Sequence, residues 1–282
     1  MNTPLLLALP LLLAATFAGC VHGPPRSSGA SRNPALLDPS LATETAPEEF
    51  SVKLFTTDGV VLIDVTRAWA PLAADRFYNL VNVGYFDDTA FFRVIGGFMA
   101  QVGLHGDPNV NAVWAKAELP DEPRTESNVT GMVAFSTAGP GTRATQIVIS
   151  VKDNPSFDEQ GYVPFGKVRD IEIADNLYFG YGEGAPAGKG PDPTRIQQEG
   201  NPYLVEGFPE LDWVRRARVV SRPGGGFAGP QCPQPKKIRK QRVVFPKAPQ
   251  PSPSEDDGDG GGGRGGGGGR GGGGGRGGGG SR

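Results

Sequence analysis

The stretch from Phe91 to Gly103 constrains the fold of this chain more than any other. It reads FFRVIGGFMAQVG, two short apolar runs separated by a pair of glycines. Because a glycine pair permits a sharp bend or a bulge, we predict two short strands joined by a tight turn. Strict strand alternation would place Met99 and Gln101 on one face and Phe98 on the other. A local irregularity is therefore expected if all three side chains serve one pocket.

Arg93 is the single charged residue of this stretch, and it follows two phenylalanines. A guanidinium resists deprotonation, so this sequence carries a permanent charge into an aromatic patch. Such a charge suits a binding or catalytic site. The alternative interpretation is a solvated strand cation whose apolar neighbours belong to the core.

The segment before this stretch predicts a hairpin and a helix. Residues 50–55 alternate between apolar and polar side chains, a turn follows at Asp58-Gly59, and residues 60–65 return as a second strand. Pro71 stands near the first position of an amphipathic helix, and Gly84 lies just past its end, where a left-handed cap is common. The order is thus strand, strand, helix and then the glycine-interrupted pair.

The residues 91–103 resemble the central motif of the cyclophilins, F-H-R-[VI]-I-x-G-F-M-x-Q-x-G, with Phe92 in the place of the usual His. Later segments resemble the same family: Ala138-Gly139-Pro140 with Gln146, Phe157-Asp158, and residues 162–168. The resemblance covers residues 49–221. It implies a mainly β domain, a closed antiparallel eight-stranded barrel capped by two helices.

The resemblance also implies an activity, that of a peptidyl-prolyl cis-trans isomerase. An X–Pro bond interconverts over tens to hundreds of seconds, and a catalyst that stabilises the twisted amide needs no covalent chemistry. By the family's pattern Arg93 is the catalytic residue, which donates to the twisted amide nitrogen. The residues that the resemblance assigns to substrate binding are Phe98, Met99, Gln101, Ser136, Thr137, Val148, Phe157 and Tyr162. Proline-containing polypeptides are the expected partners, and no cofactor is expected.

Two departures from the family pattern bear on the expected pocket. Val148 stands where a Phe usually forms the pocket floor, and Ser156 stands where a Trp or another aromatic residue often forms the rim. We therefore expect a wider and weaker pocket, and Ser156 argues against tight binding of cyclosporin. The alternative function is a catalytically weak proline-peptide binding module or chaperone. Retention of Arg93 favours the enzyme, because binding alone has no need of a donor at the amide nitrogen.

The N-terminal residues indicate export. Residues 1–20 resemble a signal peptide whose Ala18-Gly19-Cys20 end is similar to a bacterial lipobox, so Cys20 is a candidate lipidation site. Ordinary secretion with cleavage nearby is the alternative. Residues 21–48 are rich in Pro, Ser, Ala and Gly and predict a flexible linker. We thus expect an exported protein of the cell envelope, a membrane-anchored lipoprotein facing the periplasm or the outer surface.

The positions of cysteine and histidine argue against a structural disulfide and a metal site. The chain holds Cys20 and Cys232, and its two histidines are His22 and His105. If Cys20 is lipidated, Cys232 has no partner, and a structural zinc site would need a cluster that these residues do not form. We expect no metal and a monomer.

Residues 222–282 predict a disordered tail. Pro-rich and basic segments are followed by a repeat of Arg and five Gly. Residues 231–282 hold ten Lys and Arg against four Asp and Glu, a net charge of +6. Because the whole chain has a net charge of −2, residues 1–230 have a net charge of −8. Such a segment buries too little apolar surface to fold. Nucleic-acid binding is not expected of an exported tail without aromatic residues in its repeat, whereas attraction to anionic envelope polymers or lipid, or a scaffolding role, remains open.

Overall fold

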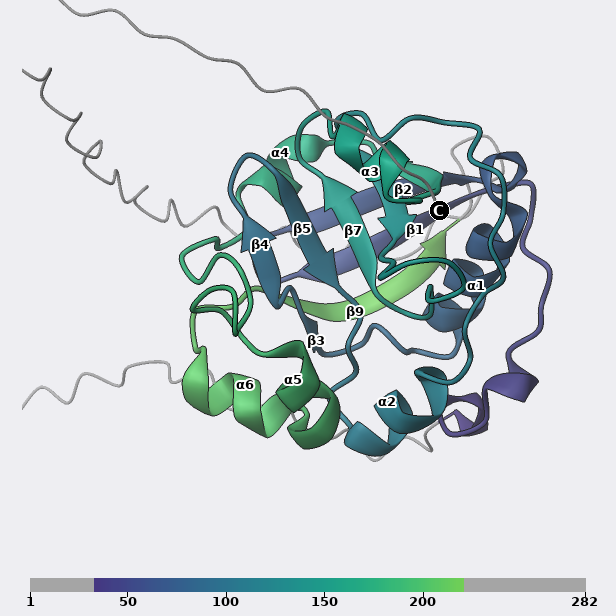
Figure 1. Ribbon diagram of the computed structural model, residues 1–282. Coiled ribbons are helices and arrows are strands. Elements are labelled where there is room, and N and C mark those ends of the chain that lie inside the picture. Colours follow the sequence, from purple (N-terminus) through teal and green to yellow (C-terminus); the bar gives the residue numbers. More distant parts are fainter. Residues whose placement is uncertain (1–32, 221–282) are drawn as a thin grey trace, which may run out of the picture. The chain divides into compact units, whose positions relative to one another are not determined.

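The computed structural model describes residues 33–220, and the expected signal peptide with Cys20, residues 21–32 and the tail 222–282 lie outside the described residues. The described strands form one antiparallel sheet in the order β3-β9-β1-β2-β8-β6-β7-β5-β4 (Figure 1). Their bounds are β1 Glu49–Thr56, β2 Val60–Thr66, β3 Thr89–Ala90, β4 Arg93–Ile95, β5 Met99–Val102, β6 Met132–Phe135, β7 Ile147–Ser150, β8 Pro164–Val168 and β9 Trp213–Val220.

The two ends of this sheet are neighbours along the chain. β3 and β4 stand at opposite ends of the strand order, yet only Phe91 and Phe92 separate them. The chain itself therefore joins the two ends, and no ladder between β3 and β4 is found among the described residues. The mainly β, antiparallel prediction is confirmed. The prediction of a closed eight-stranded barrel is not, because the described sheet has nine strands.

Helices cover the sheet in larger number than the two predicted. The described α-helices are α1 Pro71–Asn82, α2 Pro108–Trp114, α3 Pro155–Glu159, α4 Ile171–Asp175, α5 Pro193–Glu199 and α6 Asn201–Gly207, beside the 3-10 turns η1 Pro34–Leu36, η2 Pro39–Leu41 and η3 Arg67–Trp69. α1 matches the expected helix, and Gly84 follows it with φ +81°. The additional helices are one to two turns long, too short to show a helical period in the sequence.

The main core lies between the sheet and α1. Its aromatic centre is formed by Phe77 of α1 against Phe86 and Phe165, with ring centroids 5.6 and 5.0 Å apart, and by Phe135 beside Phe165 at 5.2 Å. All four side chains are fully buried. Burial of such rings is a major source of stability in a domain of this size.

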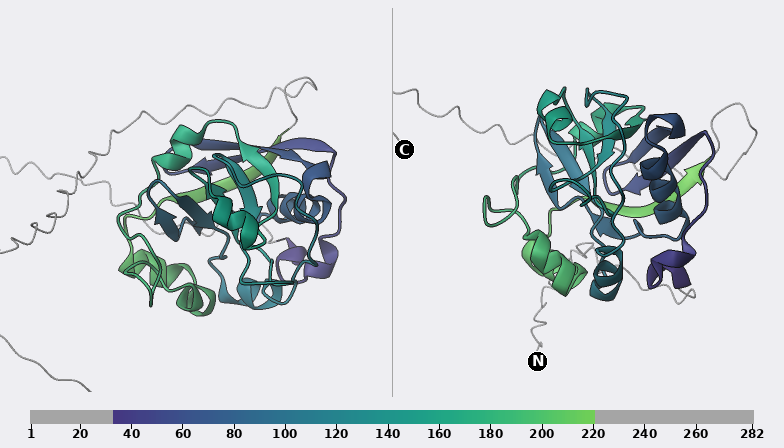
Figure 2. Two further views of the ribbon diagram at one scale, coloured as in Figure 1. Left: turned by 45° about the horizontal axis from the view of Figure 1, so that its top comes forward. Right: turned by 45° about the vertical axis from the view of Figure 1, so that its right-hand side comes forward.

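A second, smaller core forms under α5 and α6. These two helices lie together and apart from α1 in every view (Figure 2). Phe92 and Trp213 pack there against Ile196 and Leu204 from the two helices. Phe92, the residue found in place of the usual His, is thus buried under the segment 193–207. An apolar side chain suits that position.

The first described residues differ from the expected linker 21–48. Residues 33–48 pack on the domain, with Leu36 and Ala46 buried in the main core. The indole nitrogen of Trp114 donates a hydrogen bond of 3.1 Å to the carbonyl of Leu36. Asp75 of α1 accepts from the backbone of Ala46 at 2.9 Å. These contacts are with residues far along the chain, which the composition of residues 21–48 does not reveal. The prediction of a flexible linker is therefore wrong for residues 33–48, which are ordered.

Within residues 33–220, no helix has the length and apolar character that crossing a bilayer requires. The same residues hold no group of three or more His, Cys, Asp or Glu side chains placed to bind a metal ion.

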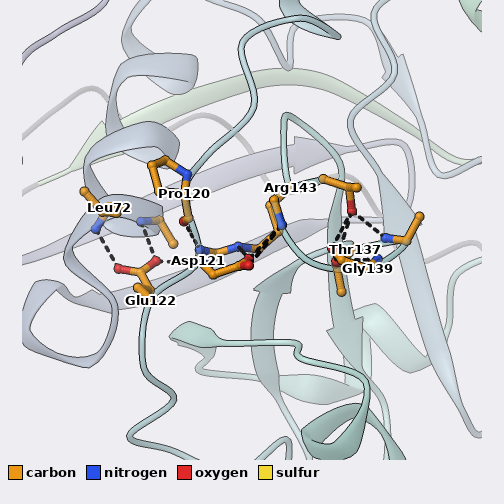
Figure 3. A network of polar contacts seen from close by, with 11 residues as sticks. Leu72, Pro120, Asp121, Glu122, Thr137, Gly139 and Arg143 are labelled. Carbon is orange, nitrogen blue, oxygen red and sulfur yellow. Dashed lines mark hydrogen bonds and ion pairs between the residues drawn. The ribbon is translucent and has the colours of Figure 1, made fainter.

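A buried ion pair ties the loop 136–146 to the start of α1 (Figure 3). Arg143 is 1% exposed, and its guanidinium donates to Glu122 at 3.0 Å and to the carbonyl of Pro120. Glu122 also accepts from the first backbone N–H groups of α1: that of Leu72 donates to Oε2 at 2.9 Å, and that of Ala73 donates at 3.0 Å to Oε1, the oxygen that binds Arg143. One carboxylate therefore satisfies both a helix start and a buried cation.

Replacing Glu122 by Ala should lower the free energy of unfolding by about 3 kcal/mol, because it removes the nearer carboxylate of the buried Arg143 and leaves only the carbonyl of Pro120 and the exposed Asp121, whose Oδ1 lies 4.0 Å from Nε. Urea denaturation measures this loss. The exposed Glu118, four residues earlier, provides the control, and Glu118→Ala should change stability by less than about 0.5 kcal/mol. Equal unfolding midpoints for the two variants would show that the pair does not hold the fold together.

Candidate functional site

The glycine-interrupted stretch folds as predicted into β4, a tight turn and β5. Gly97 takes φ +65°, a conformation that side-chain-bearing residues rarely adopt, and the N–H of Phe98 donates to the carbonyl of Ile95 at 2.9 Å. Phe98 belongs to the turn, and β5 begins at Met99. The expected irregularity thus lies at Phe98, which packs with Met99 in one apolar cluster despite being its neighbour.

Arg93 and Gln101 stand directly opposite each other on β4 and β5. Nη1 of Arg93 donates to Oε1 of Gln101 at 3.1 Å and lies 3.9 Å from the sulfur of Met99. The opposite edge of the guanidinium binds Glu183, with Nε to Oε1 and Nη2 to Oε2 both at 2.6 Å. The structure thus brings two of the sequence-predicted site residues, Gln101 and Met99, to the guanidinium of a third, Arg93.

Gln101 extends this polar chain to the strand β6 and the loop after it. Its amide nitrogen donates to Oε1 of Gln146 at 2.9 Å and lies 3.3 Å from the hydroxyl of Ser136. Gln101 is 7% exposed, so its donors and acceptor need such partners. Thr137 faces its own turn instead. Its hydroxyl donates to the carbonyl of Gly139 at 2.6 Å (Figure 3).

An apolar cluster lies beside Arg93. It is distinct from the main core and from the core under α5 and α6, and Ile95 and Phe98 are its partly buried members. Its buried members are Met99, Ala134, Val148, Phe157 and Tyr162. A permanent cation at the border of an apolar cluster is the arrangement that the sequence predicts for residues 91–103.

Aromatic rings form one wall of this cluster. The rings of Phe157 and Tyr162 stack with centroids 4.4 Å apart and planes 14° apart, and Phe98 meets Phe157 at 5.2 Å. The side chain of Asn128 donates to the carbonyl of Tyr162 at 3.0 Å and to Asp158 at 2.7 Å, which fixes the segment after α3. Phe157 and Tyr162, which the sequence assigns to the site from two separate segments, therefore form a single surface.

The two residues that depart from the family pattern lie in different surroundings. Val148 is 1% exposed and pairs with Gln101 on one side and with Ala134 on the other, so it forms the base of the cluster between β5 and β6. Ser156 lies exposed on α3, immediately before Phe157. The base of the cluster is thus aliphatic, and its rim at Ser156 lacks a ring.

Glu183 was not predicted from the sequence, and Gln146 was noted there only as a matching position. Glu183 lies in a Gly- and Pro-rich segment without periodicity, ninety residues from Arg93. The hydrogen bonds from Arg93 hold the pKa of its carboxyl below the usual glutamate range, against the opposing effect of burial, and the N–H of Gly184 acts in the same direction. Glu183 therefore carries its charge at neutral pH.

Comparison with protein families finds a match over residues 51–178 to the family described as cyclophilin type peptidyl-prolyl cis-trans isomerase. The chain is 37% identical over 130 residues to a peptidyl-prolyl cis-trans isomerase-like 3 from Rhizopus delemar, an alignment that covers 43% of this chain and 75% of the relative. It is 34% identical over 135 residues to the human protein of the same name, covering 45% of this chain and 81% of the relative.

Among solved structures, a cyclophilin type peptidyl-prolyl cis-trans isomerase from Cryptosporidium parvum is similar with a TM-score of 0.46 and 20% identity, over 62% of this chain and 99% of that one. A further structure of that protein, obtained in the presence of the dipeptide Ala-Pro, gives a TM-score of 0.45 with 20% identity, over 61% of this chain and 99% of that one. Glu183 and the helices α5 and α6 follow the range that the family model matches.

Proposed function

The chain belongs to the cyclophilin type peptidyl-prolyl cis-trans isomerases, and we propose that it accelerates X–Pro isomerisation at the site around Arg93. The observation that carries this proposal is the position of Arg93 between the apolar cluster and the side chain of Gln101. A proline ring and the amide before it need these two environments side by side.

The proposed mechanism rests on differential binding of the twisted amide. Rotation about the X–Pro bond crosses a barrier of about 18–20 kcal/mol because amide resonance is lost. As resonance is lost, the proline nitrogen becomes pyramidal and more basic. A guanidinium N–H aimed at that nitrogen therefore binds the transition state more strongly than the planar ground state. Arg93 supplies such a donor without any change in its own protonation.

The remaining site residues hold the peptide. The proline ring packs against Phe98, Met99 and Phe157, and Tyr162 offers a hydroxyl at the rim. Gln101 binds the substrate backbone, for which its amide group gives up one of its contacts with Gln146, Ser136 or Arg93. Ser136 and Thr137 border the site from the loop after β6, although Thr137 needs a change of hydrogen-bond partner to reach a ligand.

The expectation of a wide pocket with modest peptide affinity rests on Val148 in the place of a Phe and on Ser156 in the place of an aromatic residue. A Phe in place of Val148 would add ring surface, and each lost aromatic contact weakens binding. Ser156 also supports a low affinity for cyclosporin. Val148 gives weight to the second candidate, a proline-peptide binding module or chaperone whose catalysis is weak.

Protease-coupled or NMR-exchange measurement of a short X–Pro peptide distinguishes the two. The wild type should accelerate isomerisation, and Arg93→Ala should abolish turnover while peptide affinity stays nearly the same, because the lost interaction forms chiefly in the transition state. Equal loss of turnover and affinity would contradict the role of Arg93. A well-folded wild type without activity would favour the binding module, and Val148→Phe would then test whether the pocket base is the cause.

We further propose that the protein acts on exported or envelope proteins from a lipid anchor at Cys20. The support comes from the apolar residues 4–18 followed by Ala18-Gly19-Cys20. Two joined signals, a cleavable apolar segment and a small-residue approach to a cysteine, suit a lipoprotein.

Mass spectrometry of the full chain expressed in a bacterial host tests the anchor. The wild type should begin at an acylated Cys20, and Cys20→Ala should lose both the lipid and the membrane fraction. Cleavage without acylation would instead support ordinary secretion, and an intact N-terminus at Met1 would contradict export.

A further inference from the structure

We propose that Glu183 is a positioning residue for Arg93: its carboxylate binds one edge of the guanidinium and thereby orients the other edge toward the apolar cluster. This inference rests on the proposed function and deepens it. Its basis is the paired contact of both carboxylate oxygens with Nε and Nη2, each at 2.6 Å. Paired contacts of this kind fix the plane as well as the place of a guanidinium.

The N–H donors of Arg93 are shared among several partners. Arginine has five N–H donors in a rigid fork. Glu183 accepts two of them, Gln101 accepts one from Nη1, and a second Nη1–H lies toward the sulfur of Met99. The remaining donor is on Nη2. The donors that a ligand can reach thus lie on the Nη1–Nη2 side, next to Met99 and away from the carboxylate.

The loop that carries Glu183 is held to the same strand as Arg93. Gly182 forms a bridge with Val94, the residue after Arg93. The carbonyl of Glu183 accepts from Gly190 at 2.8 Å, and its own carboxylate accepts from the N–H of Gly184 at 2.9 Å. The carboxylate is therefore placed by backbone contacts on both sides and does not depend on the cation alone.

Close approach in this loop requires glycine. A Cβ built on Gly188 would lie 2.2 Å from the carbonyl oxygen of Glu183, and one built on Gly190 would lie 2.8 Å from the same atom. The backbone can therefore pass this close to Glu183 only because positions 188 and 190 are glycines. The glycines that leave this loop without a periodic sequence pattern are therefore also the residues that allow it to hold the carboxylate of Glu183 in place.

Positioning of this kind matters for the reaction because a free arginine side chain must give up rotamer freedom to reach the transition state. A guanidinium already fixed in its working orientation avoids that loss and needs no reorganisation when the amide twists. A carboxylate also offsets part of the positive charge. The two effects oppose each other, so the direction of the change on removing Glu183 decides between a positioning residue and a competitor for Arg93.

The test measures isomerisation of an X–Pro peptide by the full chain and its variants. Glu183→Ala should lower kcat by about tenfold with KM nearly unchanged, because the substrate still binds while the donor is misplaced. Glu183→Gln keeps the length and one acceptor oxygen and should show a smaller loss. An unchanged or increased kcat in folded Glu183→Ala would overturn the positioning role.

Glu199→Gln is the matched control. Glu199 forms an equally short pair with Arg195 on α5, at 2.6 Å, in the same C-terminal part of the domain. Its loss should leave kcat and KM at the wild-type values. A similar loss of activity in Glu199→Gln would show that the effect of Glu183→Ala is a general loss of order, which would also overturn the proposal.

A measurement independent of activity separates this inference from the proposed function. By NMR, the carboxyl of Glu183 should titrate at a lower pH in the wild type than in Arg93→Ala, and the Nε–H signal of Arg93 should be lost in Glu183→Ala. If both hold but the wild type lacks activity, the proposed function fails while the ion pair stands. If the wild type is active and Glu183→Ala retains its kcat, the proposed function stands and positioning is overturned.

Discussion

A guanidinium keeps its charge wherever the fold places it, so a chain that carries Arg93 into an apolar patch must surround it with acceptors. The fold does so from two directions. Gln101 reaches it across the β4–β5 pair, and Glu183 reaches it from a loop ninety residues later in the chain. The apolar cluster around Met99 then borders the side that remains. The turn after β4, the loop before α5 and the hydrogen bonds of Gln101 all serve to hold one side chain.

Arg143, which is fully buried where Arg93 is partly exposed, has a structural role of the same kind. Arg143 joins the loop after β6 to Glu122 and thereby to the first turn of α1. That loop also carries Ser136 and Gln146, the partners of Gln101. The polar chain that begins at Arg93 therefore continues to a loop anchored by a buried ion pair. Short-range order at the site depends on long-range contacts, which is why the framework extends beyond the motif itself.

The parts of this structure that follow local rules could be predicted, and the parts that follow tertiary contacts could not. Alternation predicted β1 and β2 to within a residue or two, and the glycine pair predicted the turn before Met99. The helices α5 and α6 have seven residues each, which is too few for a period to appear. Glu183 stands among glycines and prolines, and the contacts that place it, such as the bridge between Gly182 and Val94, form only in the folded chain. The order of residues 33–48 depends in the same way on distant partners.

Arg93→Lys tests the central claim most directly. The claim is that the site depends on the fixed arrangement of the guanidinium N–H donors and that a positive charge alone is not enough. Lysine keeps the charge but cannot hold a carboxylate with two parallel donors and still present a second edge to a peptide. We expect the rate of X–Pro isomerisation by Arg93→Lys to fall by about tenfold or more, with peptide affinity maintained. A rate equal to that of the wild type would contradict the account, because a point charge would then be enough.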